Sequence, residues 1–111
     1  MSLASEELSD RVRDLLARHR SITEKKMFGG RCFMIDGNMV VCPLKEGGLL
    51  VRVGKGGYEE ILSLPGASAM NMGSKTMSGF VEVSGDVLED DDVLQEWVER
   101  ARVFVSTLPP K

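Results

Sequence analysis

Residues 34–39 of the chain, Met34-Ile35-Asp36-Gly37-Asn38-Met39, decide the fold, because they place a tight turn between two apolar runs. An Asp-Gly pair favours a two-residue type I′ turn, in which both central residues take positive φ. The turn predicts an antiparallel hairpin in which Ile35 faces Asn38 and Met34 faces Met39.

The same register assigns a role to the two cysteines. Cys32 is expected opposite Val41, which places Cys42 opposite Arg31 and on the other face of the sheet. Two cysteines are too few for a four-ligand zinc site. We therefore expect both to be reduced packing residues of a cytosolic protein.

Both faces of this hairpin carry apolar side chains, whereas a sheet with one wet face alternates more clearly. The second face is therefore expected to be covered, either by another element or by a second copy of the chain. The apolar residues are Phe33, Ile35 and Val40 on one face and Cys32, Met34, Met39 and Val41 on the other.

Upstream of the hairpin, an apolar stripe at helical spacing predicts a helix over Ser5–His19. A strand-like pattern begins at Glu24 and is interrupted by Gly29-Gly30, which we interpret as a bulge or kink in one long strand, with a tight turn as the alternative.

Downstream, apolar runs predict strands at Leu49–Val53, Ser68–Met72 and Phe80–Val83, with a loop over Gly73–Ser78. A short helix is expected at Tyr58–Leu62. The final helix has apolar residues at helical spacing over four turns, and Asp92 with Gln95 has the spacing of a capping box. The pattern predicts an α+β fold with helices and strands in the order αβββαββα.

The 111 residues and the net charge of −3 fit one ordinary globular domain, expected over residues 4–111 after a Met1–Leu3 expression remnant. No apolar run is long enough to span a membrane, and the N-terminus lacks a secretory signal pattern. We therefore expect a cytoplasmic protein without membrane contact.

The sequence contains no recognisable catalytic constellation, so we expect neither an enzyme nor a cofactor or metal site. His19 is the only histidine and is expected at a helix end among arginines. Asp90-Asp91-Asp92 is interpreted as a helix cap. Neither Gly54-Lys55-Gly56-Gly57 nor Gly73-Ser74-Lys75-Thr76 has the spacing of a phosphate-binding P-loop.

A mildly basic middle segment offers one candidate surface for nucleic acid. No recognition helix or pair of RNA-stacking aromatics accompanies it, so a solubilising surface is the preferred interpretation. The candidate contacts are Lys25, Lys26, Arg31, Lys45, Arg52 and Lys55.

Several segments, in order, resemble the N-terminal domain of the TfoX/Sxy family, bacterial regulators of DNA uptake competence. They are Lys26-Met27-Phe28-Gly29-Gly30, Ile35-Asp36-Gly37, residues 49–53, residues 72–81, Trp97-Val98 and residues 106–111. The resemblance implies a two-layer α+β fold, an antiparallel sheet with packed helices, in the same order αβββαββα. Full-length members carry a second, C-terminal domain, and Lys75-Thr76 stands where the family usually has Arg-Pro.

These observations predict a non-enzymatic regulatory module that contacts another protein or itself as a homodimer. The alternatives are a nucleic-acid-binding protein and a ligand binder or enzyme with an unfamiliar site. The candidate partner or ligand surface comprises Met27, Phe28, Gly29, Gly30, Arg31, Met72, Lys75 and Met77.

Overall fold

A computed structural model describes residues 3–17, 22–27, 30–44, 47–72 and 75–110. The elements run in the order α1 (Leu3–Leu16), β1 (Ile22–Met27), β2 (Gly30–Ile35), β3 (Asn38–Pro43), β4 (Leu49–Arg52), α2 (Tyr58–Leu62), β5 (Ala67–Met72), β6 (Lys75–Val83), α3 (Gly85–Leu88) and α4 (Asp91–Val105).

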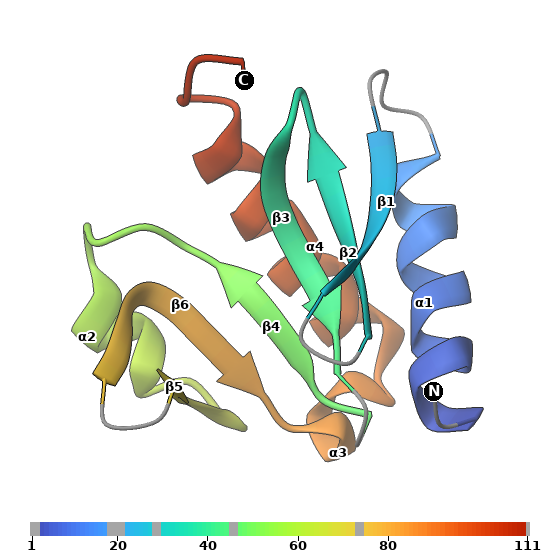
Figure 1. Ribbon diagram of the computed structural model, residues 1–111. Coiled ribbons are helices and arrows are strands. Elements are labelled where there is room, and N and C mark those ends of the chain that lie inside the picture. Colours follow the sequence, from blue (N-terminus) through green and yellow to red (C-terminus); the bar gives the residue numbers. More distant parts are fainter. Residues whose placement is uncertain (1–2, 18–21, 28–29, 45–46, 73–74, 111) are drawn as a thin grey trace.

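The strands of this described part form one antiparallel sheet in the order β1-β2-β3-β4-β6-β5. In Figure 1, α4 runs behind β3 and α1 lies to the right of β1. The helix α4 contacts β3 and β4, and α1 contacts β2, β3 and α4. The expected α+β class and two-layer arrangement are confirmed. None of the helices described here combines the length and apolar character that a membrane span requires.

The main core lies between the sheet and the two long helices. Apolar residues of alternate strand positions face α1 and α4, and each helix buries one stripe against them. Its most buried members include Leu16, Phe33, Val41, Leu49, Val51, Val81, Val83, Leu94 and Ala101.

The hairpin at Asp36-Gly37 forms as predicted. Asp36 has φ 52° and Gly37 has φ 83°, the two positive values that a type I′ turn requires. Ile35 pairs with Asn38 and Met34 with Met39. Asn38 is buried, and its Nδ2 donates a hydrogen bond of 3.0 Å to the carbonyl oxygen of Pro109.

The prediction that the two cysteines lie on opposite faces of the sheet was wrong. A β-bulge between Phe33 and Met34 shifts the register, so Phe33 rather than Cys32 pairs with Val41. Antiparallel pairing then places Cys32 opposite Cys42, on the same face. Both are free thiols and fully buried.

The second face of the hairpin is covered within the chain itself. Cys32, Cys42 and Leu50 are inaccessible to solvent, and they form a separate apolar cluster with Met39 and Leu44. Met70 on β5 and Phe80 on β6 pack against that cluster. Of the two expected covers, another element and a second copy of the chain, the first is observed.

Three further differences concern element boundaries. Met27 pairs with Gly30, so β1 and β2 are two antiparallel strands; the expected bulge in one long strand was wrong, and the tight-turn alternative was correct. The strand β6 begins at Lys75 and pairs back onto β5, so most of the expected 73–78 loop is strand. The short helix α3 after Ser84 was not predicted.

Candidate functional site

The helix α4 presents a charged outer surface beside a buried apolar stripe. Asp90 is its N-cap, and the Asp90 Oδ1 atom accepts a hydrogen bond of 2.9 Å from the backbone N–H of Asp92. The cap is therefore one residue before the helix, not at Asp92 as the capping-box spacing suggested. Trp97 and Val98 are buried against the core, whereas Glu96 and Glu99 remain exposed.

A hollow of about 470 Å³ lies where α3 and α4 meet the segment before β5. Its apolar wall consists of Leu64, Pro65, Val87, Val93 and Trp97, and its polar residues are Asp86, Asp90, Glu96 and Arg100. The volume lies within the range of ligand pockets in proteins.

Gly66 allows the segment 64–66 to approach α3. Its φ is 79°, and a Cβ atom at this position would lie 2.6 Å from the Cγ2 atom of Val87. The Gly66 carbonyl oxygen also accepts a hydrogen bond of 2.9 Å from the N–H of Ser84. One wall of the hollow thus depends on a residue without a side chain.

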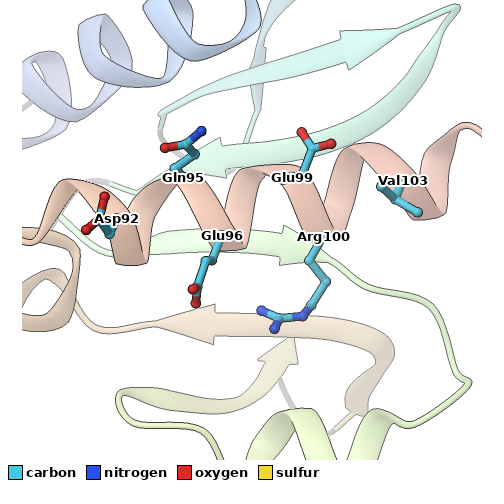
Figure 2. Close-up of a pocket in the computed structure, with 6 residues that line it drawn as sticks. All are labelled: Asp92, Gln95, Glu96, Glu99, Arg100 and Val103. Carbon is cyan, nitrogen blue, oxygen red and sulfur yellow. The ribbon is translucent and has the colours of Figure 1, made fainter.

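A second, shallower hollow continues along α4 from the first. Its lining residues, drawn in Figure 2, are Asp92, Gln95, Glu96, Glu99, Arg100 and Val103. Glu96 and Arg100 belong to both hollows. We call the combined surface, defined by the lining residues of the two hollows, the α4 groove.

Arg100 and Val103 give the α4 groove its two unusual features. The Arg100 guanidinium lies over the Trp97 ring, 4.8 Å from its centroid, so the cation covers an aromatic face. Val103 is 51% exposed, the one large hydrophobic residue so exposed in the described part of the chain. The groove therefore joins apolar contact area to charge.

The charge of the α4 groove is predominantly negative. Residues 86–99 include seven acidic and no basic residues. Asp91 is paired with Arg11 at 2.8 Å and Glu99 with Arg102, whose pKa is raised by that contact. Among the described residues, no cation forms an ion pair with Asp86, Asp92 or Glu96.

The residues predicted as a partner surface lie in two separate hairpins. Met27, Gly30 and Arg31 belong to β1 and β2, and β3 and β4 separate them in the sheet from Met72, Lys75 and Met77 on β5 and β6. Arg31 and Met77 are partly buried. Phe28 and Gly29 lie outside the described residues, as do the side chains of Met27, Met72 and Lys75.

The described basic residues of the predicted nucleic-acid surface do not form one continuous surface, because they lie on different faces and elements of the fold. In the register of β1 and β2, Lys26 lies opposite Arg31, so both side chains are on one face of the hairpin. Strand alternation directs Lys25 to the other face. The Arg52 guanidinium lies between the rings of Phe80 and Phe104, 5.7 and 5.9 Å from their centroids. Lys55 is exposed before α2, and Lys45 lies outside the described residues.

Glu24 neutralises part of this basic surface. Its carboxylate accepts two hydrogen bonds of 2.8 Å from Arg13 and one of 3.4 Å from Arg31. The bidentate contact with Arg13, reinforced by Arg31, lowers the pKa of the Glu24 carboxyl group below its usual 4.5.

Catalytic and metal-binding groups were not expected from the sequence. His19 lies outside the described residues. Within the described ranges, no three His, Cys, Asp or Glu side chains converge as metal ligands.

The α4 groove was not predicted, because Trp97 was treated only as a member of the apolar stripe of the final helix. The run of acidic residues before Arg100 and the Pro65-Gly66 turn are the two signals in the sequence that relate to it. Neither signal indicates that the two segments meet in space.

A profile of the TfoX N-terminal domain family matches residues 14–104, which include all six strands and nearly all of α4 but only the last three residues of α1. No curated protein matches the chain in sequence.

Proposed function

This chain belongs to the TfoX N-terminal domain family, and on that premise we propose that it is a cytoplasmic regulatory module that acts by contacting another protein. A role in the regulation of competence is part of this proposal and is supported only by the resemblance to that family. Because one fold supports many functions, the molecular activity has to be argued from the surface of this chain.

The α4 groove is the observation that carries the proposal. Protein-interaction surfaces combine an apolar, aromatic centre with a charged rim. Here Leu64, Val87 and Trp97 provide the apolar wall, and exposed carboxylates border it. The exposed side chain of Val103 extends the apolar contact area along α4.

The partner we propose is a basic, amphipathic segment of another protein. Asp86, Asp92 and Glu96 form none of the ion pairs found among the described residues, so lysine or arginine side chains of a partner can pair with them. Arg100 provides the single cation of the groove and accommodates one acceptor of the partner. Apolar side chains of the same segment would cover Val87 and Val93.

Trp97 makes this proposal directly measurable, because it is the only tryptophan and it lines the groove. We would titrate the protein with a synthetic helical peptide of lysine and leucine and follow the Trp97 emission. A matching peptide of glutamate and leucine is the control ligand. We expect saturable binding of the basic peptide that weakens as salt rises.

Two charge reversals then locate the binding surface. Glu96→Lys, in both hollows of the groove, is expected to weaken binding at least tenfold. Glu7→Lys, on the exposed side of α1, makes the same change of charge elsewhere and is expected to leave the affinity unchanged.

Equal affinity for the acidic peptide would contradict the proposal, as would an unchanged affinity of the Glu96→Lys variant. Sedimentation of the protein alone provides a further check. A dimer that Glu96→Lys dissociates would make a second copy of this chain the occupant of the groove.

A further inference from the structure

The cluster on the second face of the sheet contains two thiols that the proposed function does not use. The shifted register places Cys32 and Cys42 directly opposite each other on β2 and β3. Directly opposed residues of an antiparallel pair have Cα atoms about 4.5–5.5 Å apart. That separation is within the range that a disulfide bond spans.

The two side chains already interact. A hydrogen bond between the thiols lowers the pKa of Cys32 and, together with burial, raises the pKa of Cys42. This contact therefore favours ionisation of Cys32 and disfavours ionisation of Cys42. A pair with one more acidic thiol and one resolving thiol is typical of redox-active dithiols.

We propose that Cys32 and Cys42 form a reversible redox site, in which a peroxide oxidises the two opposed thiols to a disulfide between β2 and β3. The bond would connect the two strands beside the β-bulge at Phe33 and Met34. No strand would need to move, because the register already brings the two residues together.

The oxidation balances with hydrogen peroxide as the oxidant. Cys32 gives up its proton, and its sulfur attacks one peroxide oxygen and breaks the O–O bond, which leaves a sulfenic acid and releases one water. The sulfur of Cys42 then displaces the hydroxyl group, which leaves as a second water with the Cys42 proton. Two electrons pass from the thiols to the peroxide, and a small thiol such as glutathione returns them.

Access to the pair is controlled by the β5–β6 hairpin. Both cysteines are inaccessible to solvent, and Met70 and Phe80 of that hairpin pack against their cluster. The strand β5 is the last strand of the sheet and has a register irregularity between Ala69 and Asn71. Local opening of this edge admits a small oxidant without unfolding the main core.

The first test measures the equilibrium of the wild-type protein in glutathione redox buffers, in native conditions and in denaturing urea. The two cysteines are close in sequence, so the unfolded chain also forms the disulfide. The difference between the ratios of disulfide to dithiol in the folded and the unfolded protein therefore measures how much the sheet favours the disulfide. We expect the ratio of disulfide to dithiol to be at least tenfold higher in the folded protein. An equal or lower ratio would overturn the proposal.

The second test identifies the product of peroxide treatment. Trypsin releases residues 32–45 as one peptide, since Arg31 and Lys45 bound it, and cleavage before Asp36 then separates the two cysteines. We expect the two fragments to remain joined until a reductant is added, with the intact chain lighter by two hydrogens. Chains linked to one another, or a stable sulfinic acid, would overturn the proposal.

Discussion

The Arg13 guanidinium donates two hydrogen bonds of 2.8 Å to the Glu24 carboxylate and so joins α1 to the first strand of the sheet. The same guanidinium also pairs with Asp10 and lies 5.8 Å from the centroid of the Phe33 ring. One side chain thus links the helix, the strand β1 and the core residue beneath them.

Replacement of Glu24 by glutamine should lower the free energy of unfolding by about 0.5–1 kcal/mol at pH 7, as for other partly exposed ion pairs. The folded protein holds the pKa of Glu24 below its usual 4.5, so this contribution is complete above pH 4.5 and is lost as the pH falls through the folded value. Urea unfolding at pH 7 and pH 3 measures the change. Glu7→Gln, on the exposed side of α1, is the control, and a difference between Glu24→Gln and wild type that does not shrink from pH 7 to pH 3 would contradict the assignment.

Replacement of Gly66 by alanine should destabilise the protein by about 1–3 kcal/mol, because its φ of 79° is unfavourable for a residue with a Cβ atom. The new Cβ would also collide with Val87 and displace the wall of the α4 groove. Thermal unfolding and the Trp97 emission report the two effects. Gly56→Ala is the matched control, since no atom lies within 4 Å of its added Cβ, and equal loss in both variants would contradict the explanation.

Replacement of Asp90 by alanine should cost about 1 kcal/mol of stability, the usual effect of removing an N-cap side chain. Asp92→Ala removes the same charge from the first turn but no cap hydrogen bond, so its effect should be a few tenths of a kcal/mol. Chemical denaturation of the two variants decides between the cap that the structure shows and the capping box at Asp92.

We expect double-stranded DNA to bind no more tightly than about 10⁻⁴–10⁻⁶ M, the range of non-specific contacts. The physical reason is that Lys25 and Lys26 are directed to opposite faces and that Glu24 neutralises Arg31. Fluorescence anisotropy with a labelled duplex measures the affinity. Nanomolar binding that the double change Lys25→Glu, Lys26→Glu abolishes would instead support the nucleic-acid alternative.

The sequence predicted the fold where the information is local. Asp36-Gly37 determines the turn through backbone preferences alone, and the stripe from Leu94 to Val105 determines α4. The bulge beside Phe33 has no such local signal. It lets Val40 and Val41 both enter the main core, an arrangement that depends on the helices packed above them.

The same distinction explains what was missed at the candidate sites. Leu64 and Trp97 line one hollow although more than thirty residues separate them in the chain, and neither segment alone indicates a groove. Cys32 and Cys42 were assigned to opposite faces because the turn was extrapolated without the bulge. A shift of one residue was enough to bring the two thiols together.

The composition of β1 has a consequence for solubility. As the first strand of the sheet, β1 has one side without a neighbouring strand, and such an edge can template the addition of strands from other molecules. Thr23, Glu24, Lys25 and Lys26 are exposed in succession along it. If β1 of a second molecule docked against this edge, Lys25 and Lys26 of both molecules would lose water and face like charges. The polar sequence of β1 thus protects the sheet from growing into aggregates.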